Sequence, residues 1–531
     1  MNKNLLLGDE ALALGALHAG LSGVFAYPGT PSTEITEFIQ LNALARERGV
    51  HSDWSANEKT AMEAALGMSY CGKRALVCMK HVGMNVCADA FVNSAMTGAN
   101  GGLVVTACDD PSMHSSQNEQ DSRFYADFAM MPCFEPASQQ ETYNIIQAAY
   151  DYSERRHIPV LMRLTTRMAH SRAVVSTNTE AREQNTVHYP ENPRQWVLLP
   201  ANARVRNEQL IADFAQFEAD AVEMGFNTLT DGTDNSIGII ACGIAYNYLM
   251  EQFPNGCPYP VLKVQQYPFP RALARQLASR VKRIIVMEEG QPLVEQRITG
   301  ILDTPVKISG RLDGTLPRTG ELTPDCVRLA VGLQPLPERA ASQTTVPRPP
   351  ALCQGCGHRD FYTALNNVIH TYGDTARVFS DIGCYTLGWL APFHAFHTCV
   401  EMGASLTMAL GAATSGVHPA VAVIGDSTFT HSGMTGLLDA VNAKAKLTLC
   451  ISDNLTTGMT GGQDSAGTGR LEAICTGIGV EPEHVRVIVP LPKNYEEMER
   501  VIREEIEYDG PSVIIARREC IQTLKRHAAK K

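Results

Sequence analysis

Residues 420–463 read AVAVIGDSTFTHSGMTGLLDAVNAKAKLTLCISDNLTTGMTGGQ and predict a strand, a helix and a second strand in succession. The apolar run Val421–Ile424 is typical of a buried parallel strand, and so is the later run Leu447–Ser452. Between them, apolar residues from Met434 to Val441 recur with the spacing of an amphipathic helix. Because the carboxyl ends of parallel strands joined by a helix meet at one edge of the sheet, this stretch predicts a ligand-binding edge.

Two side chains with hard oxygen atoms follow these two strands. Asp426 and Asn454 are 28 positions apart in the chain but are expected side by side at the edge. With the backbone carbonyl of Thr456 they offer three oxygens, which fits Mg²⁺, a cation that keeps its remaining octahedral positions for water and phosphates. Gly425 would let the backbone approach a diphosphate, and the hydroxyl of Ser427 could donate to it.

The pattern of a Gly-Asp pair followed by Asn resembles the motif that binds thiamine diphosphate through Mg²⁺. Ser427 stands where that motif usually has glycine. A common turn at Gly425-Asp426 and a helix cap at Asn454 are the simpler interpretation. The agreement of strand, helix, strand and spacing favours the cofactor site.

The bulk composition places the chain among soluble globular proteins. It has 531 residues, enough for about three domains, with 44% hydrophobic and 19% charged residues. The net charge of −11, with one short basic run at 525–531, argues against a nucleic-acid surface. The N-terminus has acidic residues within its apolar part, so we expect no signal peptide, no membrane span and a cytoplasmic location.

The order of strand-like and helix-like patterns predicts a multi-domain α/β protein with parallel sheets flanked by helices. Residues 1–170 alternate the two patterns and form the first predicted domain, and 171–235 form a polar connecting arm. Residues 236–335 read as a smaller α/β domain and 336–350 as a proline-rich linker. Residues 351–531, which contain the opening stretch, form the last domain.

Three polar side chains of the first region are candidates for chemistry. Glu58 precedes a helix of small residues, where it is either a first-turn acid or a buried carboxylate for a cofactor. Thr30 lies in a turn that leads into a helix, where it is either a cap or part of a site for a carboxylate. Arg123 is a candidate bidentate carboxylate clamp, with a surface ion pair as the alternative.

Four of the fifteen cysteines are expected near the same sheet edge. Cys353 and Cys356 form a CxxC pair, Cys384 follows the predicted strand 377–380, and Cys520 follows the predicted strand 512–516. Four thiolates are the ligand set of an iron–sulfur cubane or of a structural zinc. A redox pair and a zinc knuckle remain alternatives, because one CxxC is a weak signal.

Motifs over nearly the whole chain resemble those of the 2-oxoacid:ferredoxin oxidoreductases, most closely the α subunits of the indolepyruvate branch. The motifs that carry the resemblance occur in the family's order: Tyr27–Glu34 (YPGTPSTE), Asn57–Lys59, Lys80–Asn85 (KHVGMN), Arg163–Arg167 (RLTTR), Leu199–Arg204 (LPANAR), Cys353–His358, Asp381–Gly388 (DIGCYTLG), Gly425–Ser427 and Met459–Gly461.

This resemblance implies a pyrimidine-binding first domain, a middle domain like the transketolase C-terminal domain and a diphosphate-binding last domain. It implies that Glu58 contacts the pyrimidine of thiamine diphosphate and that Thr30 and Arg123 hold the substrate carboxylate. Asp426, Asn454 and Thr456 would bind Mg²⁺, and Cys353, Cys356, Cys384 and Cys520 would bind a [4Fe-4S] cluster. The remaining cofactor-binding positions would be Gly383, Cys384, Thr386, Gly425, Asp426, Ser427, Asn454, Met459 and Thr460.

The expected activity is oxidative decarboxylation of an aryl 2-oxoacid, with thiamine diphosphate as electron sink, coenzyme A as acyl acceptor and the cluster as electron carrier. The resemblance implies a smaller β subunit in an α2β2 assembly. Family α subunits usually carry a C-terminal ferredoxin-like domain, whereas this sequence stops eleven residues after Cys520. We therefore expect electrons to pass to ferredoxin or another acceptor, directly or through another subunit. A non-oxidative decarboxylase or carboligase and a catalytically idle scaffold subunit are the alternatives.

Overall fold

The computed structural model describes residues 2–189, 193–299, 305–337, 342–346 and 348–530. The chain divides into two compact units, residues 1–339 and 340–531. Of the linker predicted at 336–350, residues 338–341 and 347 lie outside the described residues.

The first unit contains a seven-stranded sheet that is parallel except at one edge. Its strands, in sheet order, are β12 (Gln266–Tyr267), β6 (Cys133–Phe134), β7 (Val160–Thr165), β5 (Leu103–Asp109), β4 (Ala75–Lys80), β2 (Gly23–Ala26) and β3 (His51–Trp54). The central strands β4, β5 and β7 are buried over their whole length, because helices cover both faces of a parallel sheet.

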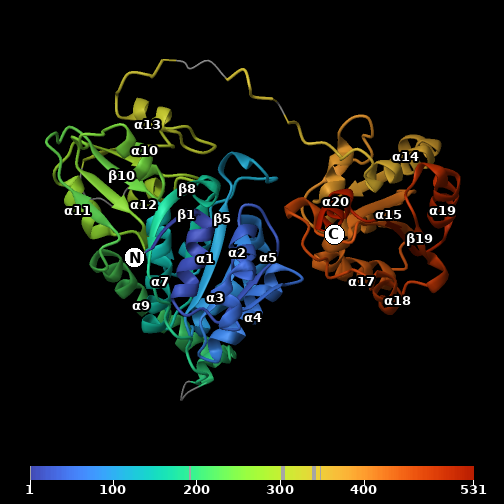
Figure 1. Cartoon of the computed structure of the whole chain (residues 1–531), viewed down its shortest axis with the longest axis horizontal. Coiled ribbons are helices and arrows are strands. Elements are labelled where there is room, and N and C mark those ends of the chain that lie inside the picture. The colour runs from blue at the N-terminus through green and yellow to red at the C-terminus, as the bar shows by residue number, and fades with distance from the viewer. Residues whose placement is uncertain (1, 190–192, 300–304, 338–341, 347, 531) are drawn as a thin grey trace. The chain divides into compact units, whose positions relative to one another are not determined.

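Helices pack on both faces of this sheet (Figure 1). One group, whose members contact one another through α1, comprises α1 (Gly8–His18), α2 (Thr33–Leu41) and α7 (Gln139–Arg156). The other group is the contacting pair α4 (Glu58–Tyr70) and α5 (His81–Thr97). Right-handed crossovers between the parallel strands put these two groups on opposite faces. Three shorter helices complete this part: α3 (Ala43–Glu47), α6 (Arg123–Phe128) and α8 (Thr166–His170).

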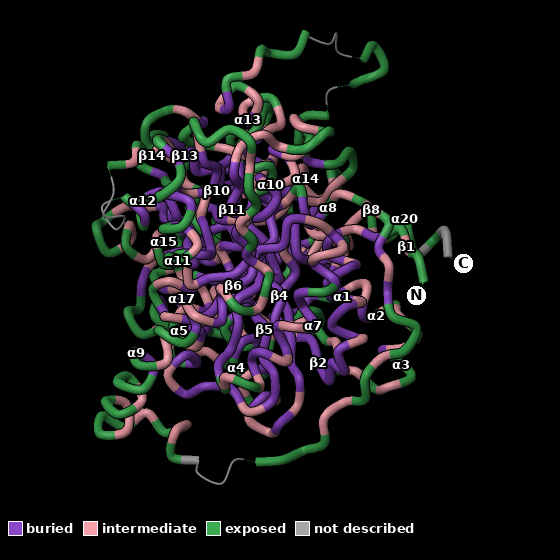
Figure 2. Tube along the Cα trace, turned by 90° about the vertical axis from the view of Figure 1, so that its left-hand side faces the viewer, coloured by how far each residue is buried: buried purple, intermediate pink, exposed green. Residues whose placement is uncertain are grey.

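The rest of the first unit is built on a five-stranded sheet. Its strands, in order, are β14 (Lys307–Ser309), β13 (Arg283–Met287), β10 (Gly238–Cys242), β11 (Val261–Val264) and β9 (Thr228–Thr230), of which β9 is antiparallel. Its helices are α10 (Ala245–Glu251), α11 (Arg271–Ala278), α12 (Leu293–Ile298) and α13 (Pro324–Ala330). One apolar core contains residues of both sheets, and Figure 2 shows the buried residues along strands such as β4, β5 and β10.

The segment 171–235 does more than connect. It contributes β8 (Arg172–Thr177), which pairs antiparallel with β1 (Asn2–Leu7), and α9 (Pro200–Glu223), a helix of 24 residues. A further strand of the downstream segment, β12, pairs with β6 and so extends the first sheet. The two larger sheets of the first unit are therefore joined by main-chain pairing as well as by their core.

The second unit is a six-stranded, fully parallel sheet. Its strands, in order, are β16 (Thr398–Cys399), β15 (Arg377–Ser380), β17 (Ala420–Gly425), β18 (Leu447–Asp453), β20 (Pro511–Arg517) and β19 (Val485–Ile488). One core contains α14 (Gly357–Ile369) and α19 (Tyr495–Glu507). A second core contains α15 (Ala404–Thr414), α17 (Met434–Asn442) and α18 (Leu471–Ile478).

The strand–helix–strand unit predicted at 420–463 is confirmed, and so is the α/β class. The helical segment begins earlier than the apolar spacing indicates, with α16 (Asp426–Thr428) and a π-helical turn, Phe429–Gly433, before α17. Gly425 pairs with Ser452, so the residues that follow the two strands emerge together at one edge.

Among the described residues, no helix combines the length and the apolar character that crossing a membrane requires.

Candidate active site

Asp426 lies at the carboxyl end of β17 in the second unit, where its side chain is buried. Burial raises the pKa of its carboxyl to about 7, and the negative charge of Asp453 adds to the effect. Its Oδ2 atom has no hydrogen-bond partner among the described residues. A buried carboxylate oxygen without a partner is costly unless a cation neutralises it, so this position fits a metal ligand.

The loop after β18 brings Asn454 to the same edge. Asn454 Oδ1 accepts a hydrogen bond from the Thr456 main-chain N–H at 3.1 Å, and Thr456 itself is buried. The main-chain carbonyl of Asn454 accepts from the N–H of Cys520 at 3.0 Å. This last bond ties the loop that holds two of the predicted magnesium ligands to the loop that carries a predicted cluster ligand.

The four predicted cluster cysteines gather beside this loop. A methyl carbon built on Gly458 would lie 3.4 Å from Cys384 Sγ, 3.9 Å from Cys520 Sγ and 3.5 Å from Asn454 Nδ2. Burial raises the pKa of the Cys384 thiol to about 12, and the nearby thiols of Cys356, Cys520 and Cys353 raise it further.

The other two cysteines lie just before α14. The main-chain N–H of Cys356 donates to the carbonyl of Cys353 at 3.1 Å, and Gln522 Nε2 donates to Cys353 Sγ at 3.4 Å. Gln522 belongs to α20 (Ile521–Lys530), which begins directly after Cys520. The CxxC pair and the segment around Cys520 are therefore in contact.

The remaining predicted cofactor residues line the same edge with differing exposure. Ser427 Oγ lies 2.9 Å from Thr457 Oγ1, and Thr460 Oγ1 donates to Gln463 Oε1 at 2.6 Å. Thr386 Oγ1 accepts from the Gly383 N–H at 3.0 Å and so closes the turn after β15. Met459 is 55% exposed, which leaves its side chain available to a ligand.

Tyr385 and Asp381 are two residues of this edge that the sequence-based prediction missed. The ring of Tyr385 lies against Gly383 and Gly425, where a Cβ atom would approach its Cε1 to 2.3 Å and 2.7 Å. Its hydroxyl donates to the buried carboxyl of Asp381, whose pKa burial raises to about 7. The contact joins Tyr385 to Gly425, 40 positions further along the chain, so the sequence alone could not show it.

In the first unit, Glu58 begins α4 and its carboxyl is buried. It lies against Gly83 in the first turn of α5, where a Cβ atom would come within 2.7 Å of Glu58 Cγ and 2.8 Å of its Oε1. With the Glu58 carboxylate in this position, a Cβ atom at residue 83 would clash with it, and glycine avoids the clash. The fit between the two residues explains a glycine inside a helix, where alanine is otherwise favoured by about 1 kcal/mol.

Thr30 is half-buried in the loop after β2, and its carbonyl accepts from Ser115 Oγ at 3.4 Å. The same Ser115 accepts two hydrogen bonds from Lys80 Nζ, at 2.6 Å on its carbonyl and 3.2 Å on its hydroxyl. Lys80 and Thr30 are thus neighbours at the carboxyl ends of β4 and β2. From the sequence, Lys80 has no role beyond its place in the KHVGMN motif.

The guanidinium of Arg123, the second residue predicted to hold the substrate carboxylate, is paired with groups of the chain itself. Its side chain is 1% exposed and lies between carboxylates of Asp121, Glu288 and Glu135. It also donates to Tyr267 Oη at 3.1 Å and to the carbonyls of Glu289 and Gln291 at 3.1 and 3.0 Å. These contacts occupy the guanidinium and join the segments around the two larger sheets of the first unit, so Arg123 could hold a substrate carboxylate only if some of them open.

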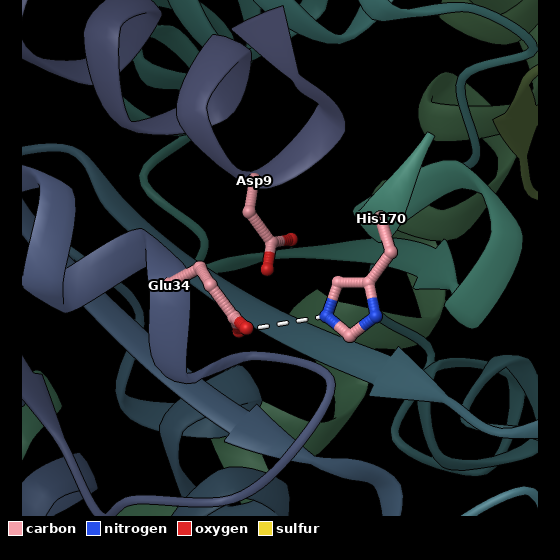
Figure 3. Close-up of side chains that lie close together, drawn as sticks. All are labelled: Asp9, Glu34 and His170. Atoms are coloured by element: carbon pink, nitrogen blue, oxygen red, sulfur yellow. Dashed lines mark ion pairs between the residues drawn. The ribbon is translucent and has the colours of Figure 1, made fainter. Parts of the chain in front are cut away.

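A third cluster, Asp9, Glu34 and His170, lies on α1, α2 and α8 (Figure 3). One ligand atom from each residue lies within 4.8 Å of the others, and His170 Nε2 is 3.5 Å from Glu34 Oε2. Both carboxyl oxygens of the fully buried Asp9 lack a hydrogen-bond partner among the described residues. Burial raises the pKa of Asp9 well above its usual value, and the charges of Glu34 and Glu10 add to this. Burial therefore favours the neutral form of Asp9, and a bound cation would favour the ionised form.

Comparison with family models identifies thiamine diphosphate-binding regions in both units. Residues 14–224 match the model described as pyruvate flavodoxin/ferredoxin oxidoreductase, thiamine diphosphate-binding. Residues 381–516 match the model described as thiamine pyrophosphate enzyme, C-terminal TPP binding domain.

Curated relatives are similar over almost the whole chain. The indolepyruvate oxidoreductase subunit IorA of Archaeoglobus fulgidus is 39% identical, covering 98% of this chain and 86% of its own length. The subunit of the same name from Methanothermobacter thermautotrophicus is 36% identical, covering 98% of this chain and 87% of its own length. Among solved structures, 2-oxoglutarate:ferredoxin oxidoreductase from Magnetococcus marinus is 15% identical, with a TM-score of 0.49 over 62% of this chain and 64% of its own.

Proposed function

Because this chain belongs to the family of indolepyruvate oxidoreductase IorA subunits, and so is the α subunit of a thiamine diphosphate-dependent 2-oxoacid oxidoreductase, we propose that it oxidises an aryl 2-oxoacid such as indolepyruvate. In this proposal coenzyme A takes the acyl group and a [4Fe-4S] cluster passes the electrons to ferredoxin or another acceptor. A smaller β subunit in an α2β2 assembly and a cytoplasmic location complete the proposal.

The observation that carries the electron path is the gathering of four thiols beside Asp426 and Asn454. Among the described residues, no three of these thiols have Sγ atoms within 4.8 Å of one another. A tetrahedral zinc would hold its thiolates about 3.8 Å apart, given Zn–S bonds of about 2.3 Å. A cubane binds each cysteine to a different iron and needs a wider spacing. The arrangement therefore favours the cluster over structural zinc.

Each of the predicted site residues named below has a defined task in this proposal. Asp426 and Asn454, with the carbonyl of Thr456, would hold Mg²⁺ and through it the diphosphate. Glu58 would accept a hydrogen bond at its carboxylate from the pyrimidine of the cofactor, and Gly83 keeps that carboxylate in place. When bound, thiamine diphosphate supplies the electron sink for decarboxylation. The raised pKa of the Cys384 thiol means that cluster binding must release protons, because the thiolate is the ligand form.

The proposal is tested on the α subunit co-purified anaerobically with its β subunit. We expect about four iron and four sulfide per chain, bound thiamine diphosphate and Mg²⁺, and coenzyme A-dependent reduction of a viologen dye with an aryl 2-oxoacid. An aldehyde product from a preparation without iron would instead establish the non-oxidative decarboxylase. A preparation that binds no thiamine diphosphate would establish a scaffold subunit.

Substitution of Glu58 tests the catalytic assignment. Glu58→Gln should abolish turnover and leave the visible spectrum of the cluster unchanged, since Glu58 is in the first unit and the cysteines are in the second. Glu63→Gln is the matched control, because Glu63 is on the same helix with its side chain 48% exposed. Retained turnover in Glu58→Gln would contradict the assignment.

A further inference from the structure

Lys80 is a buried cation at the carboxyl end of β4, directly before α5. Its side chain is 8% exposed. Of its three N–H donors, two are used by the carbonyl and hydroxyl oxygens of Ser115. Both of these partners are neutral, so the positive charge of Lys80 is not balanced by its hydrogen bonds.

No carboxylate oxygen of the described residues lies within 4.0 Å of Lys80 Nζ. The contrast with the two buried arginines is sharp: Arg123 and Arg163 each lie within that distance of three carboxylates. Asp110 is the acid that acts electrostatically on Lys80. Its Oδ2 accepts from the N–H of Ser115 and its Oδ1 from Thr166, so both oxygens are engaged elsewhere.

His81, the next residue, supports the presence of a ligand near this junction. It is 1% exposed, and its Nδ1 atom has no hydrogen-bond partner among the described residues. Its Nε2 lies 3.3 Å from Asn118 Oδ1 in the loop that also carries Ser115. A buried ring nitrogen without a partner costs free energy unless a ligand or a water completes it.

Lys80 lies near two residues that already have proposed roles, Thr30 for the substrate and Glu58 for the cofactor. Gly29 and Lys80 are packed together, because a Cβ atom on Gly29 would lie 3.2 Å from Lys80 Cβ, and Thr30 follows Gly29. Glu58 contacts Gly83, which lies within one helical turn of Lys80. The unbalanced cation is therefore close to the residue proposed for the cofactor and adjacent to the residue proposed for the substrate.

We propose that Lys80 binds the carboxylate of the 2-oxoacid substrate beside Thr30, one of the two residues to which the family resemblance gives that task. This inference rests on the proposed function and names the group that selects an acid over a neutral ketone. A carboxylate at this place would neutralise the buried ammonium and accept its third N–H. Burial lowers the pKa of Lys80 to about 8 in the free protein, as expected of an ammonium that lacks a counter-ion.

The test uses Lys80→Gln in the complete complex, since glutamine keeps a hydrogen-bond donor and removes the charge. Calorimetry would compare indole-3-acetate with the neutral indole-3-acetamide. Wild type should prefer the acetate, and Lys80→Gln should lose that preference through a rise in Kd of roughly 30-fold or more. Lys80→Arg should restore part of the preference. Lys73→Gln, a change two residues before β4 begins, is the control and should match wild type.

Kinetics provide the second measurement. KM for indolepyruvate should rise in Lys80→Gln at unchanged iron and thiamine diphosphate content, whereas a merely structural role would change those contents too. The proposal is overturned if wild type does not discriminate the acetate from the acetamide, or if Lys80→Gln keeps the discrimination. A wild-type complex that oxidises no 2-oxoacid but shows Lys80-dependent acetate binding would refute the proposed function and leave this site standing.

Discussion

Buried charged side chains in this protein differ in whether the chain itself balances them. Arg163 lies fully buried between Asp109, Asp121 and Glu135, and Arg123 has a similar set of partners. Removing one partner of such a buried network costs about 3–5 kcal/mol, which identifies these residues as structural. Lys80 and Asp9 lack such partners, so their chemistry depends on pH or on a ligand.

The pH dependence of the reaction should reflect the protonation of the Lys80 amine. A substrate carboxylate binds the protonated amine, and the amine of the free protein loses its proton at about pH 8. We expect kcat/KM, which reports the free enzyme, to fall as pH rises above about 8. Burial lowers the pKa of Lys80, and the charge of Asp110 opposes this effect. Burial also lowers the pKa of the adjacent His81, which Asp109 raises and Lys80 lowers further. In Lys80→Arg the fall should disappear from the range up to pH 10, since arginine stays protonated there; an unchanged profile would contradict the assignment.

The buried carboxyl of Asp9 leads to a prediction about how the free energy of unfolding depends on pH. Its pKa is raised in the folded protein, so folding takes up a proton and the free energy of unfolding falls as pH rises above about 4. Asp9→Asn should therefore gain stability over wild type as pH rises, with a slope that approaches about 1.4 kcal/mol per pH unit. Thermal unfolding of both proteins from pH 5 to pH 8 measures this, with Asp53→Asn as the exposed control. A variant less stable than wild type at every pH would show that the ionised carboxylate is required, as a metal ligand would be.

At the residue level, the sequence could identify groups whose chemistry depends on their type and spacing. Asp426 and Asn454 directly follow predicted strands, and the CxxC pair lies just before α14. The ion pairs of Arg123 could not be foreseen, because its partners Glu288 and Tyr267 are more than 140 positions away in the chain. Lys80 was overlooked for the converse reason, since the absence of a counter-ion is a property of the folded surroundings.

Secondary-structure elements were predictable where burial and pattern agree. The fully buried strand β18 falls where the run Leu447–Ser452 indicated, because a strand covered on both faces is mostly apolar. The edge strand β3 (HSDW) is half-exposed and polar, and β12 has two residues, so neither carries a pattern of its own. The start of α9 at Pro200 had a local signal, because proline is favoured in the first turn of a helix.

The contact between α4 and α5 predicts the effect of filling one glycine. In Gly83→Ala the new methyl group would overlap Glu58 and displace its carboxylate. We expect kcat to fall at least roughly 10-fold, since a misplacement of about 1 Å can cost 10²-fold, while helix propensity keeps the fold intact. Gly67→Ala in α4 is the control, because a Cβ atom at that position would meet nothing within 4 Å. Full activity of Gly83→Ala would contradict the placement of Glu58.

At the scale of the whole chain, two units are joined by a segment whose described part, residues 342–346, is exposed and outside any helix or strand. We expect limited proteolysis with a protease of broad specificity to cut there first. The exposed stretch near residue 184 should resist longer, because Gln184 donates to the carbonyls of Leu21 and Arg48. Mass spectrometry of the first fragments checks this, and an initial cut inside the seven-stranded sheet would contradict the division.

The pairing of β12 with β6 has a consequence for synthesis on the ribosome. The nascent chain completes β7 about 100 residues before it reaches Gln266, given the positions of the two strands. During that interval β6 presents an unsatisfied edge, which is a template for mispairing with other chains. Buried Asn227 later fixes the closing strand through hydrogen bonds with the main chain of Gln265 and Gln266. Translation products that end before residue 266 should consequently be the ones that chaperones capture or that accumulate as aggregates.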